Sequence, residues 1–159
     1  MATEKLKFKL ELWAEYWDKA PRAKILINDH NHFDKEITGT EKKPTIIEFE
    51  HEFTEGEKYF LVLERSGKDK KQTVVEDGKI TKDQLLHIKS IEIDEIDIGA
   101  LVYEGVYTPE YPKPWATQQL QAGKALPESF TNVTTIGHNG RWALSFESPF
   151  YMWLLENLY

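Results

Sequence analysis

Strict alternation of apolar and charged side chains near the start of the chain constrains its fold most strongly. Between residues 6 and 16 every even position is apolar or aromatic, and lysine or glutamate fills most odd positions. Because successive side chains of a β-strand point to opposite faces, this period of two predicts a strand with one buried and one wet face. Trp13 and Trp17 interrupt the wet face, so both are candidates for contact with a ligand or partner.

Other segments carry strand and turn patterns of the same kind. Alternation returns at 47–53, and five successive apolar residues at 59–63 predict a strand covered on both faces. Apolar pairs at 86–98 slip by one residue twice, which predicts a bulged strand that ends in a turn near Asp94-Glu95. Asn139-Gly140 is a hairpin signal, because both residue types tolerate positive φ.

Helix signals appear only late in the chain. Residues 115–122 contain good helix formers and stop at Gly123, and Ser148-Pro149 precedes a second helix at 150–158. About eight to ten short strands with two small helices predict an all-β fold, an antiparallel β-sandwich of jelly-roll type. No boundary divides the 159 residues, so we expect one domain, 1–159.

Composition limits the partners of this domain. A net charge of −7 disfavours nucleic acid, since phosphate binding requires clustered lysine and arginine. The chain has no cysteine, which excludes disulfides and thiolate chemistry and suits synthesis in a cytoplasm. No apolar stretch approaches the ~20 residues of a membrane span, and the amino terminus lacks the apolar block of a secretory signal. We therefore expect no membrane contact.

Aromatic side chains concentrate in the last third of the chain, where charged ones are few. Residues 103–159 hold 11 of the 20 aromatic residues but only 8 of the 47 charged ones. Tyr107, Tyr111 and Trp115 recur every four residues in a proline-rich stretch, which predicts a stiff surface loop that presents an aromatic platform. The alternative is that these rings fold back over the end of the sandwich. The aromatic residues of the terminal helix and the strand before it should belong to the core.

A polar stretch at 28–34 is predicted to be a loop and contains the weak metal candidates. They are Asp29, His30, His32 and Asp34. On an extended segment the two histidines would share a side, but the ordinary alternative is a turn without metal. We expect no cofactor, with calcium at these oxygen ligands as the alternative. His51, His87 and His138 are too scattered in the sequence to nominate.

Catalysis has no positioned group in the sequence. The 27 acidic residues include a cluster at 92–97, but alternation with isoleucine assigns that cluster to the wet side of a strand. No nucleophile elbow or phosphate-binding loop is present. We therefore expect no enzyme, and a polysaccharide-acting enzyme is the third and least favoured hypothesis.

Four segments together resemble a family of viral proteins. They are Ile88–Ile98, Tyr107–Pro112, Asn139–Phe146 and Pro149–Leu155. In these segments the chain is similar to small β-sandwich proteins of tailed bacteriophages, especially marine and cyanobacterial phages, whose fold is similar to that of carbohydrate-binding modules.

The resemblance implies a function. It implies a non-enzymatic structural protein of the virion, made in the host cytoplasm, that decorates the capsid as a knob or belongs to the tail. Its partners would be other virion proteins such as the major capsid protein, held through the aromatic loop or the terminal helix. The alternative is a carbohydrate-binding module that holds a host-surface glycan on Tyr107, Tyr111 and Trp115.

Overall fold

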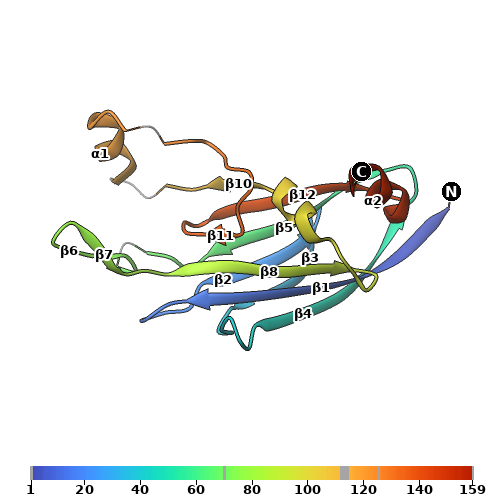
Figure 1. Cartoon of the computed structure of the whole chain (residues 1–159), viewed down its shortest axis with the longest axis horizontal. Helices are drawn as coiled ribbons and strands as arrows, with labels where there is room; N and C mark the ends of the chain where they lie inside the picture. Colours follow the sequence, from blue (N-terminus) through green and yellow to red (C-terminus); the bar gives the residue numbers. More distant parts are fainter. Residues whose placement is uncertain (1, 70, 112–114, 125, 159) are drawn as a thin grey trace.

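The computed structural model describes residues 2–69, 71–111, 115–124 and 126–158 and shows an antiparallel β-sandwich with short helices (Figure 1). Its elements are β1 (Thr3–Glu15), β2 (Arg22–Ile27), β3 (His30–Glu36), β4 (Thr45–Thr54), β5 (Lys58–Ser66), β6 (Val74–Glu76), β7 (Lys79–Lys82), β8 (Leu85–Ile93), β9 (Ile96–Asp97), the 3-10 helix η1 (Gly99–Glu104), β10 (Val106–Pro109), α1 (Trp115–Gln121), β11 (Thr135–Ile136), β12 (Gly140–Glu147) and α2 (Phe150–Leu158).

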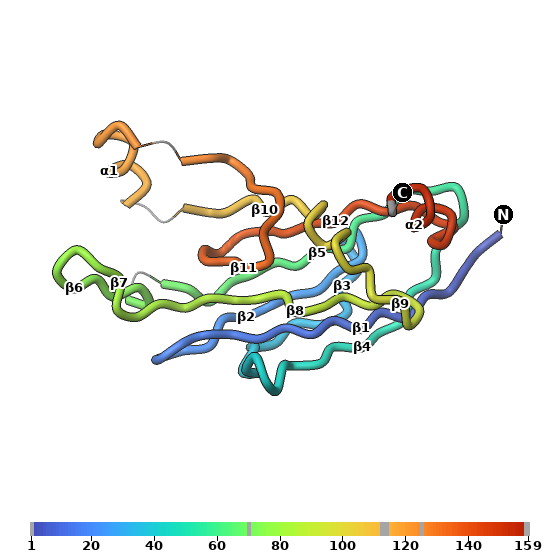
Figure 2. The backbone as a smooth tube through the Cα atoms, in the orientation of Figure 1, coloured from blue at the N-terminus to red at the C-terminus, as the bar shows by residue number. Residues whose placement is uncertain are grey.

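Two five-stranded sheets make up the sandwich, and Figure 2 shows the path of the chain between them. Sheet A has the order β11-β8-β1-β4, with β9 paired to β8, and sheet B has the order β10-β12-β5-β2-β3. The hairpin β6–β7 stands apart as a third, two-stranded sheet. The predicted all-β antiparallel sandwich is confirmed, and its jelly-roll type stays a prediction.

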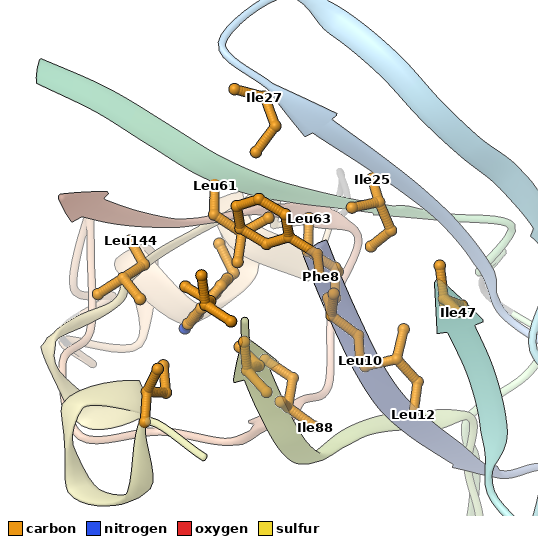
Figure 3. Packing of buried hydrophobic residues seen from close by; sticks show 14 of the residues in the cluster. Phe8, Leu10, Leu12, Ile25, Ile27, Ile47, Leu61, Leu63, Ile88 and Leu144 are labelled. Atoms are coloured by element: carbon orange, nitrogen blue, oxygen red, sulfur yellow. The ribbon is translucent and has the colours of Figure 1, made fainter. Parts of the chain in front are cut away.

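Strand β1 lies between β4 and β8 in sheet A and turns a row of apolar side chains into the core. Leu6, Phe8, Leu10 and Leu12 are at most 1% exposed, as the alternation predicted. They belong to one cluster with the inward side chains of β2, β5 and β12, and Figure 3 shows residues of both sheets meeting in this layer. Phe8, Phe53 and Phe146 form its aromatic centre, with ring centroids 5.4 to 6.2 Å apart.

Helix α2 closes the core at one end of the sandwich. Phe150 and Leu154 are buried, and the Phe150 backbone N–H donates to Oε2 of Glu4 at 2.8 Å. Glu4 comes from β1, so the first and last elements of the chain hold each other. A helix of nine residues is stable only when one face is docked. The predicted terminal helix and its core role are confirmed.

Several local predictions are also confirmed. Helix α1 covers residues 115–121, and Gly123 after it has φ +78°. The register of β1 against β8 shifts between Glu11 and Leu12, which is the expected bulge. Asp94 and Glu95 both have positive φ in the turn between β8 and β9.

The predicted loop at 28–34 is wrong, because most of it is strand β3. Asn28 has φ +52° in the turn, and its Oδ1 accepts the Phe60 N–H at 2.9 Å. Strand β3 then pairs with β2 from Glu36 back to His30. Among the described strands it is the last of sheet B, and within that part of the chain only one side of its backbone pairs with a neighbour. Polar residues suit such an exposed edge strand, and their polarity hid the strand in the sequence.

The predicted hairpin at Asn139-Gly140 is also wrong, although both flanking strands exist. Strand β11 pairs with β8 in sheet A, whereas β12 pairs with β5 and β10 in sheet B. The chain therefore crosses between sheets here. A Cβ atom at Gly140 would collide with the Thr108 carbonyl of β10, so glycine is required by the close approach of two strands.

The outer face of sheet A carries rows of opposite charge. Lysines of β1 lie between glutamates of β4 and glutamates of β8, in register. The cross-strand pairs are Lys5 with Glu52, Lys7 with Glu50, Lys9 with Glu48, and Lys9 with Glu92. Such pairs each stabilise a sheet by about 0.2–1 kcal/mol. Cross-strand charge balance therefore accounts for these carboxylates.

Replacing Lys9 by glutamate tests this charge ladder. Lys9→Glu puts a third carboxylate between two others, so we expect the free energy of unfolding to fall by about 1 kcal/mol. Roughly 1 M NaCl should remove most of the loss, because it shortens the screening length to about 3 Å. Urea unfolding measures both effects. Lys42→Glu, in an exposed loop, is the control; equal losses in the two variants would contradict the ladder.

Candidate functional site: an aromatic corner at one end of the sandwich

Three aromatic rings gather at α1, a helix that lies at one end of the molecule (Figure 1). They belong to Tyr111, Trp115 and His138, and we call this cluster the aromatic corner. The ring centroid of Tyr111 lies 6.0 Å from that of Trp115 and 5.4 Å from that of His138, and the Trp115 and His138 centroids are 5.6 Å apart. Residues 112–114 of the predicted loop lie outside the described part of the chain.

The rings of the aromatic corner are inclined to one another by 34° to 65°. They do not form the flat platform that the sequence predicted. Trp115 is 38% exposed, while Tyr111 and His138 are half-buried. The Tyr111 hydroxyl donates to the Pro127 carbonyl at 2.7 Å, which holds this ring in place. Trp115 therefore offers the most open ring surface, with two polar-edged rings beside it.

Tyr107 is buried, so its predicted place on an exposed platform is wrong. It is 4% exposed, because β10 alternates and turns this side chain toward the core. Its hydroxyl accepts the His138 N–H at 3.0 Å and donates to the His138 carbonyl at 2.6 Å. The predicted surface loop therefore begins only after Pro109, and Tyr107 acts on the site by positioning His138.

Buried and half-buried polar side chains hold the backbone around His138. Arg65 is 2% exposed and donates to the Ile136 carbonyl at 3.1 Å and to Gln84 Oε1 at 2.6 Å. The Lys68 ammonium lies 2.9 Å from Asp83, and the Asn139 side chain bonds both backbone groups of Lys68. These contacts fix the chain on both sides of His138, so the ring is held in a prepared position.

The three rings of the aromatic corner are uncharged at neutral pH. Burial lowers the pKa of His138, and the Lys68 and Arg65 cations lower it further, so this imidazole is neutral at neutral pH. Burial raises the pKa of Tyr107 to about 12 and lowers that of Arg65 to about 10. Tyr107 thus stays a phenol and Arg65 stays charged. The exposed rings carry no charge of their own.

Trp13 and Trp17 lie apart from the aromatic corner. Trp13 stacks on His87 across strands β1 and β8, with ring centroids 3.8 Å apart. Trp17 is 45% exposed, and its indole N–H donates to the Gln72 carbonyl at 2.9 Å. The Lys82 ammonium lies 4.7 Å from the Trp17 ring centroid. Both rings have structural partners, and a role for them in binding stays a prediction.

The four metal candidates do not come together. His30 and His32 are close, with ring centroids 4.6 Å apart, but Asp34 Oδ1 accepts from Arg22 Nε at 2.7 Å. His51, which its distance in the sequence had excluded, instead joins the two histidines. Within residues 2–69, 71–111, 115–124 and 126–158, no group of three His, Asp or Glu side chains could hold a metal ion.

A second exposed apolar surface lies on α2, at the opposite end of the molecule from α1 (Figure 1). Tyr151, Met152 and Leu155 are 47%, 59% and 61% exposed and lie on one side of the helix. We call them the α2 face. The Tyr151 hydroxyl donates to Asp94 at 3.0 Å, which orients its ring. Among the described residues, no helix is both long and apolar enough to cross a membrane.

Sequence reasoning missed His138, and it named the terminal helix as an attachment element without singling out the residues of the α2 face. The only signal for His138 was its position directly before Asn139-Gly140, because the ring meets Tyr111 only through the crossing between sheets. The α2 face was visible as apolar residues beyond those that the core needs. Comparison with known proteins found no matching protein family, no similar curated protein and no similar solved structure.

Tyr107→Phe tests the positioning of His138. The variant leaves the His138 N–H and carbonyl without their partner, so we expect a loss of about 1–3 kcal/mol in the free energy of unfolding. Tyr103→Phe, at a side chain that is 44% exposed, is the control and should change it by less than about 0.5 kcal/mol. Urea unfolding followed by tryptophan fluorescence measures both. Equal stability of Tyr107→Phe and the unchanged protein would contradict this role.

Proposed function

We propose that the protein is a non-enzymatic accessory protein of a phage particle that joins two partners through its opposite ends. The observation that carries attachment at both ends is that the α2 face and the aromatic corner lie on or beside helices at opposite ends of the molecule (Figure 1). The phage particle comes from the resemblance of four segments to phage proteins. The α2 face attaches the protein to the particle. The aromatic corner then points away from it.

The α2 face suits a protein partner such as the major capsid protein. Covering three side chains that are about half exposed contributes roughly 3 kcal/mol. A micromolar complex needs about 8 kcal/mol. The α2 face is therefore the apolar centre of an interface whose polar rim comes from neighbouring residues. The net charge of −7 keeps the protein away from the nucleic acid of the particle.

Particles of the encoding phage test the attachment. Quantitative mass spectrometry of purified particles should find the chain, and its absence would contradict a role in the virion. Leu155→Glu should lower its content in the particles at least tenfold, because a charge replaces a buried apolar contact. Leu120→Glu is the matched control on α1, since the two leucines are 60% and 61% exposed; equal effects would exclude the α2 face.

A second candidate function is glycan binding at the aromatic corner. The uncharged, inclined rings of Tyr111, Trp115 and His138 favour it, because aromatic rings stack on the apolar faces of sugars and ring nitrogens bond hydroxyls. This function can coexist with attachment through α2, since the two surfaces lie at opposite ends (Figure 1).

A glycan array tests the second function. The intact protein should be retained on at least one neutral glycan, and Trp115→Ala should weaken retention at least tenfold by removing the most open ring. Trp17→Ala removes a ring that is 45% exposed elsewhere and should leave retention unchanged. No retention of the intact protein, or equal retention of Trp115→Ala, would end this candidate.

A polysaccharide-acting enzyme is the least favoured hypothesis. On the outer face of sheet A, Glu48, Glu50, Glu92 and Glu95 line a depression of about 520 Å³ together with lysines. Three of these glutamates belong to cross-strand pairs of the charge ladder. A glycosidase needs one carboxyl group that stays protonated beside one that does not. Their lysine partners across the strands already give these carboxylates a structural role.

A further inference from the structure

Three histidines meet where the two sheets end on the same side of the sandwich. His30 and His32 come from β3, the last strand of sheet B, and His51 comes from β4, the last strand of sheet A. Their ring centroids are 4.6, 5.1 and 5.5 Å apart. His32 Nε2 and His51 Nδ1 are 2.8 Å apart and form a hydrogen bond. This bond links two edge strands that no backbone ladder joins.

The bond between His32 and His51 depends on protonation. In a hydrogen bond between two imidazoles one ring nitrogen donates and the other accepts, and an accepting nitrogen carries no proton. When both rings are protonated, both nitrogens are donors and the two charges repel. The third ring, His30, adds a further charge at the same place when it is protonated. Geometry alone therefore makes the contact between β3 and β4 sensitive to acid.

Carboxylates on the neighbouring elements do not neutralise this cluster. The charges that act on His32 are those of His30 and His51. Asp34 of β3 is paired with Arg22 of β2, and Glu50 of β4 is paired with Lys5 of β1. The remaining charged groups of β2, β3, β4 and the turn between β2 and β3 are Lys24, Asp29, Lys35, Glu36, Glu48 and Glu52. Strand β1 adds Glu4, Lys7, Lys9, Glu11 and Glu15, and β5 adds Lys58, Tyr59, Glu64 and Arg65.

The histidines also cover aromatic core residues. The His32 ring stacks on Phe49 with centroids 4.3 Å apart, and the His51 ring lies 4.8 Å from Phe53. Phe49 stacks in turn on Phe8 of β1, and Phe53 is fully buried. Moving the histidines apart would open this aromatic layer to water. Separation of the histidines at the sheet edge would therefore also affect the packing of Phe49 and Phe53 in the core.

The direction of the pH effect follows from the environment of the rings. Burial, and then the neighbouring histidines, lower the pKa of His32 to about 4. Burial and His30 lower the pKa of His51 below its ordinary value of 6.5. In an open form, in which β3 and β4 have separated, both rings contact water and their pKa returns to that ordinary value. The open form therefore binds more protons. Acidification from about pH 6.5 toward pH 4 therefore favours the open form.

We infer that His30, His32 and His51 form an acid-sensitive clasp, which holds β3 against β4 at neutral pH and releases this side of the sandwich when the rings take up protons. The clasp is independent of the proposed function, because it lies on neither the aromatic corner nor the α2 face. It would loosen one edge of the protein while the other strands remain paired.

Amide hydrogen exchange of the full chain tests the clasp. Mass spectrometry would follow exchange at about pH 7.5 and pH 5, with labelling times scaled to the intrinsic rate and with EDTA present to exclude bound metal ions. At the lower pH we expect peptides from residues 30–36 and 45–54 to lose protection at least tenfold relative to those from β12. Unchanged relative protection would overturn the clasp.

Two variants decide whether the histidines cause the response. His32→Phe combined with His51→Phe keeps two flat rings and removes both protonation sites, so the acid response should disappear. His87→Phe, on the outer face of sheet A, is the control and should keep the response. If the double variant does not fold, His51→Gln keeps a neutral partner for His32 and should reduce the response at least threefold. An undiminished response in whichever of these variants folds would overturn the clasp.

Discussion

The packing of β1 against the opposite sheet is the constraint on which the rest of this structure depends. Four of its inward side chains are buried almost completely, and its outward lysines lie between two rows of glutamates. Strand β1 pairs with β4 and β8 in sheet A, and its inward side chains pack against residues of sheet B. Glu4, near its start, also bonds the first turn of α2. One strand therefore connects the core to the end that carries the α2 face.

The elements that the sequence predicted well are those whose pattern is set by one buried face. β1, β8 and α2 each have such a face, and their residues repeat with the period of the element; β5 was predicted instead from five successive apolar residues, because both of its faces are covered. Strand β3 was missed because an edge strand with polar residues has the composition of a loop. The hairpin at Asn139-Gly140 was wrong because the turn signal is local, while the choice of sheet depends on partners far away in the chain.

Only part of the candidate site was predicted, because local patterns identify some of its residues and tertiary contacts bring in the others. The proline-rich stretch identified Tyr111 and Trp115, but a spacing of four residues did not distinguish them from Tyr107, which β10 turns inward. His138 joins the site through a crossing between sheets, and His51 joins His32 through the contact of two sheet edges. Such contacts depend on tertiary structure, and no local pattern in the chain encodes them.

We propose that the protein attaches to a phage particle through its α2 end. Lysine cross-linking of intact particles, read by mass spectrometry, tests it most directly, because exposed lysines mark both ends. Lys5 and Lys58 lie near α2 on strands β1 and β5, whereas Lys79 and Lys124 lie at the end that carries the hairpin β6–β7 and α1 (Figure 1). We predict cross-links to other particle proteins from Lys5 and Lys58 in clear excess. Cross-links mainly from Lys79 and Lys124 would contradict the account.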